Sequence, residues 1–418
     1  MSANVRAGYK KTEVGMLPNE WRVKSLGDVT AISSGGTPSR GRPEYWDGEI
    51  PWITTSQIDF SEINTANQFI TVEGMQNSAA RLLPPGTLLL ALYGQGKTRG
   101  KVGVLRIAAT TNQACAAIEV MRDVSISFLL HFLTSRYDAI RGMSNGGSQD
   151  NLNSRIVKSI AVILPTSAEQ CAIAAALSDV DALLAKLDAL IAKKRDLKQA
   201  AMQQLLTAQT RLPGFNGEWD VKRMKSLGTI YGGLTGKTKR DFGHGSARYI
   251  PFMNVMSDTV IDIDWLEAVD VTSYEVQNLV KKGDLFFNGS SETPEEVGFC
   301  SVLLHDVKNV YLNSFCFGFR FNIDAKINGL FYAYWFRSVK GRKAMAILAQ
   351  GATRYNITKT AFLELELPQP PQSEQTAIVK VLADMDAELA ALEARRDKTS
   401  ALKQGMMQEL LTGRIRLV

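Results

Sequence analysis

A long amphipathic segment occurs twice in this chain of 418 residues, and no other feature constrains the fold as strongly. The copies span residues 169–212 and 374–417, align without a gap, and are identical at about half of their positions. Each copy follows a proline segment, at Pro165 and at 368–371, and proline is tolerated just before a helix but not inside one. At 1.5 Å per residue, each copy predicts a helix of roughly 60 Å.

Each copy carries apolar residues spaced three and four apart, which is the pattern of a left-handed coiled coil. Charged clusters at 193–195 and 395–396 interrupt this stripe. It is expected to resume at Leu197, Ala201 and Leu205 in the first copy and at Leu402, Met406 and Leu410 in the second. An amphipathic helix packed on its own domain is the alternative, but each copy offers the other the same seam. The predicted seam residues are Leu177, Val180, Leu184, Leu187 and Ile191 in the first copy and Leu382, Met385, Leu389 and Leu392 in the second.

The segments before the two helices also repeat, more faintly. Both open on a tryptophan, Trp21 or Trp219, and both continue into a Gly-Gly loop at 35–36 or 232–233. Short apolar strands, turns and one apolar helix then follow in the same order, which predicts mixed, strand-rich α+β domains. The predicted parts are domain 1 at 1–164, the central helix at 165–210, domain 2 at 211–367 and the C-terminal helix at 368–418.

Composition narrows the class of protein. No apolar run approaches the 18 or more residues of a membrane span, and the first residues contain no apolar signal segment. Four cysteines without a CxxC pair and three scattered histidines form neither a disulfide framework nor a zinc signature. We therefore expect a reduced cytoplasmic protein with no metal and no cofactor.

The net charge of +6 is unevenly placed. Residues 165–210 hold five basic and five acidic side chains, and 368–418 hold seven of each, so the predicted helices are neutral. All of the excess positive charge lies in the two globular segments, which favours a polyanionic partner there.

No convincing catalytic motif is present. Residues 91–98 resemble a phosphate-binding P-loop and end in Gly-Lys-Thr, but Ala91 replaces the first glycine and a strand pattern follows instead of a helix. Residues 231–238 also end in Gly-Lys-Thr and also lack the first glycine of the P-loop pattern. We therefore expect neither segment to bind a nucleotide.

Several loop side chains are of the kinds that contact phosphate or base edges: arginine suits guanine, and asparagine or glutamine suits adenine. The alternative is that they are solvated loop charges and polar turns that cap helices. The candidates for DNA contact are Thr37, Ser39, Arg40, Arg42, Gln95, Lys97, Arg99, Lys101, Gln149, Asn151, Lys237, Lys239, Arg240, Ser290, Ser291, Arg354, Tyr355 and Asn356.

Four short signatures occur twice and in the same order: the Trp-x-Val-Lys opening, the Gly-Gly loop, a polar Gly loop near 147 and 351, and Leu-Pro leading to Glu-Gln at the start of the long helix. With these signatures the chain resembles the specificity subunits of type I restriction-modification systems, over nearly its whole length. The resemblance implies two tandem target-recognition domains and an antiparallel coiled coil that holds them apart and sets the spacer of a split double-stranded DNA site. It also implies two methyltransferase (M) subunits docked on the chain, motor-nuclease (R) subunits in the full complex, and no chemistry by the chain itself.

Two other readings stay open at this point. A non-enzymatic coiled-coil scaffold could use its globular domains to bind other proteins. A stand-alone enzyme such as a nuclease is disfavoured because its catalytic motifs are missing.

Overall fold

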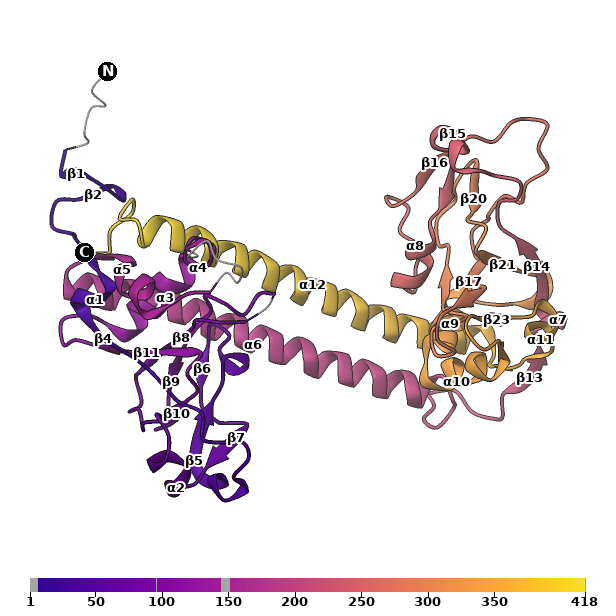
Figure 1. The fold of residues 1–418 in the computed structure, drawn as a ribbon. Helices are drawn as coiled ribbons and strands as arrows, with labels where there is room; N and C mark the ends of the chain where they lie inside the picture. The colour runs from indigo at the N-terminus through magenta and orange to yellow at the C-terminus, as the bar shows by residue number, and fades with distance from the viewer. Residues whose placement is uncertain (1–6, 95, 144–150, 418) are drawn as a thin grey trace. The chain divides into compact units, whose positions relative to one another are not determined.

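The computed structural model describes residues 7–94, 96–143 and 151–417, and it divides into two compact units (Figure 1). Unit 1 comprises Met1–Asp188 with Ala394–Val418, and unit 2 comprises Ala189–Glu393. Both divisions fall inside the two long helices, α6 (Ser167–Leu205) and α12 (Gln372–Leu410), so each unit contains a part of both. Among the described residues, no helix combines the length and apolar character that a membrane span requires.

Both predicted long helices are present, but each ends earlier in the sequence than predicted. The predicted helices reach 212 and 417, whereas α6 ends at Leu205 and α12 at Leu410. The backbone enters the left-handed region at two equivalent positions, Ala208 with φ 60° and Gly413 with φ 70°. After α12, the amide of Arg414 donates to the carbonyl of Glu409 at 3.0 Å, which is the helix-ending Schellman arrangement. The last residues of each repeat therefore turn back toward the globular domain.

Within each unit, the two helices pack antiparallel. In unit 1, Asp181 pairs with Lys403 at 2.5 Å, while Asp188, further along α6, pairs with the earlier residue Arg396 at 3.8 Å. All nine predicted seam residues are buried or half-buried. The buried ones, each at most 9% exposed, are Leu177, Leu187, Ile191, Leu382 and Leu389.

The expected resumption of the seam is wrong at Leu197 and Leu402, because these side chains are 47% and 59% exposed, whereas the later members Leu205 and Leu410 are buried. The seam positions fall one residue later, at Lys198 and Lys403, which are the matching lysines of the two repeats. Each lysine reaches a carboxylate of the other helix, and their side chains are only 19% and 20% exposed. A lysine can lay its aliphatic stem along an apolar seam while its ammonium group stays paired.

Two larger sheets, two strand pairs and short helices form the described globular part of unit 1. Its strands are β1 (Tyr9–Thr12), β2 (Gly15–Pro18), β3 (Arg22–Ser25), β4 (Thr30–Ser34), β5 (Trp46–Ile53), β6 (Glu62–Ile63), β7 (Gln68–Ile70), β8 (Leu88–Ala91), β9 (Val102–Leu105), β10 (Thr110–Thr111), β11 (Cys115–Val120) and β12 (Ala161–Leu164). The larger sheet has the order β4-β11-β8-β9-β6 and the smaller β10-β5-β7, while β1 pairs with β2 and β3 with β12. Strands β8 and β9 are fully buried, as expected of continuous apolar runs. A strand therefore follows the P-loop-like segment, as predicted.

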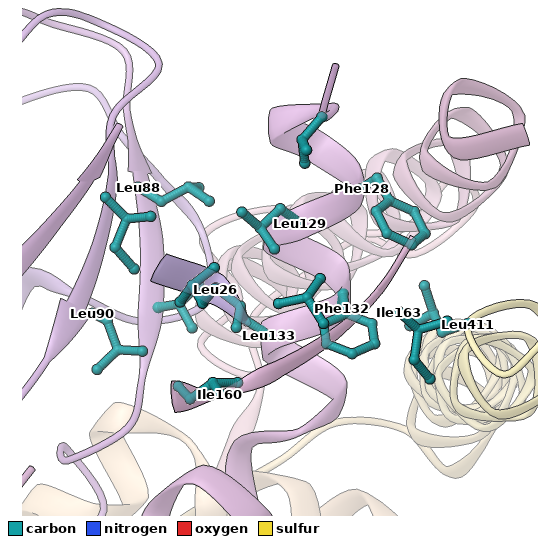
Figure 2. Close-up of a cluster of buried hydrophobic side chains, with 14 of the residues drawn as sticks. Leu26, Leu88, Leu90, Phe128, Leu129, Phe132, Leu133, Ile160, Ile163 and Leu411 are labelled. Atoms are coloured by element: carbon teal, nitrogen blue, oxygen red, sulfur yellow. The ribbon is translucent and has the colours of Figure 1, made fainter. Parts of the chain in front are cut away.

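The main core of unit 1 forms around the helix α3 (Ile126–Ser135). Ser125 caps this helix by accepting a hydrogen bond from the amide of Phe128 at 3.3 Å. Figure 2 shows Leu129 and Leu133 on the side of α3 that faces the sheet, and Phe132 toward Leu411, just after α12. Because α3 buries apolar residues on opposite sides, it connects the sheet with the start of α6 and the end of α12. The other helices are α1 (Leu26–Val29), α2 (Val72–Gln76), α4 (Tyr137–Gly142) and α5 (Ser154–Ser159).

Unit 2 repeats this plan with one extra small sheet. Its strands are β13 (Asp220–Arg223), β14 (Gly228–Gly232), β15 (Phe242–Ile250), β16 (Glu267–Val269), β17 (Leu285–Asn288), β18 (Ser290–Ser291), β19 (Cys300–Val302), β20 (Val310–Leu312), β21 (Cys316–Phe321), β22 (Ala349–Gln350), β23 (Tyr355–Ile357) and β24 (Glu366–Gln369). The sheets have the orders β14-β21-β17-β19, β16-β15-β20 and β18-β23-β22, and β13 pairs with β24. The helices are α7 (Met224–Leu227), α8 (Phe252–Ser257), α9 (Gly329–Arg337), α10 (Val339–Leu348) and α11 (Lys359–Glu364). The mixture of short helices and mostly antiparallel strands confirms the predicted α+β class.

Candidate nucleic-acid interface

The Gly-Gly loop of unit 1 lies against the turn that precedes β11. The amide of Gly36 donates to the carbonyl of Thr111 at 2.9 Å, and the Thr37 hydroxyl donates to the side chain of Gln113. A Cβ on Gly35 would stand 2.0 Å from the Thr111 carbonyl oxygen, so only glycine fits. This close contact fixes the start of the candidate loop on the scaffold of the unit.

The exposed side chains Ser39, Arg40 and Arg42 continue this loop. The Arg40 guanidinium lies 3.6 Å from the centre of the Trp46 ring and donates to Gln68 at 2.7 Å, so a cation–π contact orients it. Arg42 pairs with Glu44 at 3.2 Å, and both side chains are exposed. These cations lie on the surface, where a phosphate or a base could reach them.

The basic run near residue 100 divides into one exposed residue and two structural ones. Lys97 is exposed, whereas half-buried Arg99 donates to the carbonyl of Arg141 at 3.2 Å. Lys101 pairs with Asp59 at 2.6 Å and is 21% exposed. Arg99 and Lys101 therefore hold the loop that displays Lys97.

The polar loop near residue 150 is only partly described. Gln95 and Gln149 lie outside the described residues, and Asn151 is half-buried. Its neighbour Leu152 donates its amide to the carbonyl of Leu92 at 3.0 Å, which attaches this segment to the end of β8. The structure thus places the segment after residue 150 beside the one that follows β8.

The equivalent loop of unit 2 is tied down in the same way. A Cβ on Gly233 would stand 1.9 Å from the carbonyl oxygen of Asn313, and the next amide, of Leu234, donates to Leu312 at 2.7 Å. Lys237 pairs with Glu275 at 2.6 Å, and the Lys237 side chain is 6% exposed. Hydrogen bonds from Lys237 and from the Thr272 amide lower the pKa of Glu275 to about 2, so this carboxylate is charged near neutrality.

Beyond this pair, Lys239 and Arg240 are exposed on a short 3-10 turn. Asp241 and Thr238 close the turn through a capping box. Of the three cations predicted in this loop, these two are the ones that face solvent.

The small sheet β18-β23-β22 brings together two candidate sets that lie far apart in the sequence. Ser290 is paired with Asn356 and Ser291 with Tyr355. Arg354 is exposed directly before β23. Residues predicted separately therefore form one polar surface.

Each repeat also contains a buried anchor, of which the sequence shows only two separate repeated signatures, the opening tryptophan and the Glu-Gln pair. In unit 1, Glu169 is 1% exposed and accepts hydrogen bonds from Trp21 at 2.8 Å and from two nitrogens of Arg416, at 2.5 and 2.9 Å. The adjacent Gln170 accepts from the amide of Ser125, which caps α3. The anchor therefore ties the opening strands, the start of α6 and the end of the chain together.

Unit 2 builds the same anchor from Glu374, Trp219 and Arg211. The carboxylate accepts from Trp219 at 3.0 Å and from Arg211 at 2.6 and 2.7 Å, and this bonding raises the pKa of Arg211. Arg211 and Arg416 occupy the same place in the two repeats. This equivalence in the sequence is the signal that could have identified both arginines as members of the anchor.

A second pair of matching contacts fastens each globular domain to the helices. In unit 1, His131 of α3 lies 3.1 Å from the Ser178 hydroxyl and 3.8 Å from Asp181. Burial lowers the pKa of His131 to about 4, so the ring is neutral near pH 7. In unit 2, Tyr334 of α9 holds the equivalent place and donates to Asp386 at 2.6 Å.

The metal-ligating side chains and the cysteine thiols can be located in the described part of the chain. Within the described ranges, no group of three His, Cys, Asp or Glu side chains is placed to hold a metal ion. The three buried cysteines have their thiol pKa raised by burial, to about 12 for Cys115 and Cys316. A buried thiol with a raised pKa is a poor nucleophile.

The sequence of this chain is similar to those of known proteins. The family model of the type I restriction modification DNA specificity domain matches residues 18–193 and again residues 216–400. The type I restriction enzyme MjaIX specificity subunit of Methanocaldococcus jannaschii is 25% identical, over 69% of this chain and 70% of its own length. The MjaVIII specificity subunit of the same organism is 22% identical, over 98% of this chain and 96% of its own.

The fold of this chain is similar to that of a solved structure. The S subunit of a type I restriction-modification system from M. genitalium aligns with a TM-score of 0.57 and 13% identity. The alignment covers 93% of this chain and 96% of that one.

Proposed function

The chain belongs to the family of type I restriction-modification DNA specificity domains, and we propose that each of its two units reads one half of a split double-stranded DNA target. The chain is the DNA sequence-specificity subunit of a type I restriction enzyme: it recognises DNA and leaves the chemistry to the methyltransferase (M) and motor-nuclease (R) subunits of the complex. We keep the cytoplasm as its expected location.

One observation carries the proposal of two half-sites. The family model matches once in each repeat, and both repeats keep the same Trp-Glu-Arg anchor while their exposed loops differ. After the Gly-Gly pair, unit 1 displays the exposed Arg40, whereas the matching Lys237 of unit 2 is 6% exposed and paired with Glu275. A shared scaffold with different loop side chains suits two different half-sites. Accordingly, we assign residues 1–164 and 211–367 to recognition and the segments 165–210 and 368–418 to the spacer.

Methylome sequencing of the host with and without this gene tests the function. We expect the deletion to abolish adenine methylation at one split motif. In a second strain, residues 211–367 are exchanged for the matching segment of another specificity subunit, and one half of the motif should change while the other stays. The same exchange of residues 1–164 is the matched control and should change the opposite half. Unchanged methylation after deletion would contradict the proposal and favour the protein-binding scaffold.

DNA binding itself can be measured on the complex with its methyltransferase. The affinity should be selective for the motif and should fall with salt, because displaced counterions accompany each phosphate contact. A scaffold that binds only proteins would show neither property.

We further propose that two M subunits dock, one for each repeat. Several apolar helix residues that could have served this purpose, such as Ala174 and Met406, instead pack into the core of their own unit. The exposed leucines that remain include an equivalent pair: Leu197 in unit 2 and Leu402 in unit 1. One exposed leucine at the same place in each repeat suits two copies of one partner.

Replacing Leu197 or Leu402 with lysine should each remove one M subunit, because burying a leucine contributes about 1.5–3 kcal/mol and a lysine ammonium resists burial. Native mass spectrometry of the complex would show one M subunit for each single variant and none for the double variant. Ala401→Lys, at the exposed residue beside Leu402, is the control and should retain both. Two bound M subunits in the double variant would refute this docking surface.

A further inference from the structure

A phenylalanine stands on the surface of unit 2 beside the candidate loops. Phe315 is 61% exposed, although it directly precedes β21, whose first residues are buried. Ala114 occupies the equivalent place in unit 1, before Cys115. The exposed ring is therefore a feature of one repeat only.

The turn that carries Phe315 is held rigidly. Buried Asn313 accepts a hydrogen bond from the Phe315 amide at 2.9 Å and donates to the carbonyl of Ile250 at 3.1 Å. The Phe315 carbonyl accepts from the amide of Gly289 at 3.0 Å. Because the backbone on both sides is fixed, a partner that binds the ring does not have to order the turn.

The ring borders a hollow of about 320 Å³, which is also lined by Gly289 and Ile357, the chain neighbours of the candidates Ser290 and Asn356. Glycine backbone at 232–233 and at Gly289 forms part of the lining, and exposed Lys359 stands at its edge. Gly289 also accepts from the amide of Ile357, so the hollow adjoins the sheet that carries Ser290 and Asn356. The cationic Lys359 and the hydroxyl side chains Thr235 and Ser314 beside an apolar ring favour a nucleic acid over a purely apolar partner.

We propose that Phe315 contacts the 5-methyl group of a thymine in the major groove of the half-site read by unit 2. This inference rests on the proposed function. Thymine is the base that presents an apolar group in the major groove, and phenylalanine is among the side chains that contact it. The hollow beside the ring leaves room for the methyl group, and Ala114 in unit 1 is too short to make the same contact.

Thymine-to-uracil exchange tests the contact, because it removes only the methyl group. The wild-type complex with its M subunits is titrated with duplexes in which each thymine of the unit 2 half-site is replaced in turn by uracil. At one position we expect about a fourfold loss of affinity, the effect of one buried methyl group. Phe315→Ala should bind the thymine and uracil duplexes equally at that position, and Phe315→Leu should keep part of the preference.

Ile323→Ala is the matched control. Ile323 is fully exposed just beyond the opposite end of β21, and its removal should leave the thymine preference intact. The proposal is overturned if Phe315→Ala keeps the full preference, or if it weakens every duplex equally, as a phosphate contact or a wedge between bases would. Weakened subunit assembly with unchanged DNA binding would make the ring a protein contact instead. Failure of the wild-type complex to select any sequence would refute the proposed function as well.

Discussion

Replacing Glu169 with alanine should destabilise unit 1 more than any surface substitution in the chain. The carboxylate is buried and holds both the Arg416 guanidinium and the Trp21 ring nitrogen. Removing one partner of a buried ion pair leaves the other charge without compensation and costs about 3–5 kcal/mol. Glu169→Gln keeps an acceptor for Trp21 but loses the charge, so its effect should be smaller.

Hydrogen exchange measured by mass spectrometry resolves the two units and is the appropriate readout. In Glu169→Ala, peptides from 9–25 and 406–417 should lose protection, while peptides of unit 2 should keep theirs. Glu388→Ala is the control, since Glu388 pairs with Lys194 on the helix surface and is 48% exposed. Exposed pairs contribute about 0–1 kcal/mol. If Glu169→Ala exchanged no faster than this control, the anchor would not stabilise the unit.

The contacts of the anchor could not be predicted from the sequence. Repetition revealed Trp21 and Glu169 as members of repeated signatures, but not that they touch. The arginine that completes the anchor lies 247 residues away in the chain. Periodicity and propensity describe neighbours along the chain, so a contact at this separation appears only once the fold is known.

The helix pair could be predicted because its apolar pattern is long and periodic. The wrongly predicted seam position at Leu197 has a physical explanation. If the seam residue is chosen for its apolar side chain, the choice is Leu197, but in the structure the seam residue is Lys198. The seven-residue spacing alone leads from Ile191 to Lys198, so the spacing was the better guide than the residue type. A lysine at a seam position becomes acceptable only because Asp386 stands opposite.

The residue types of the candidate interface can be read in the sequence, but their arrangement in space cannot. The two-residue strand β18 is too short to give a periodic pattern, so its pairing with β23 left no trace in the sequence. Lys101 and Lys237 look like DNA contacts in a linear reading, yet each has a carboxylate partner from a distant loop. Their contact with DNA stays a prediction, and the exposed cations Arg40, Lys97 and Arg354 are the better first targets.

Replacing Gly233 with alanine should disable recognition of the half-site read by unit 2. The added Cβ would lie 1.9 Å from the carbonyl oxygen of Asn313 and 2.7 Å from that of Leu312. Both are backbone atoms at the end of β20, so the loop has to move instead, and with it the hydrogen bond from Leu234. Forced overpacking of this kind costs about 1–3 kcal/mol.

Gly232→Ala is an unusually close control, since a Cβ added to this neighbouring glycine would meet no atom within 4 Å. We expect peptides covering 232–238 to lose protection from exchange in Gly233→Ala alone, and DNA affinity to fall at least about tenfold, as a shift above 1.4 kcal/mol would give. Gly35→Ala, whose Cβ meets the Thr111 carbonyl, should do the same for the other half-site. Equal DNA binding by Gly233→Ala and Gly232→Ala would show that this loop does not position the residues that read the DNA.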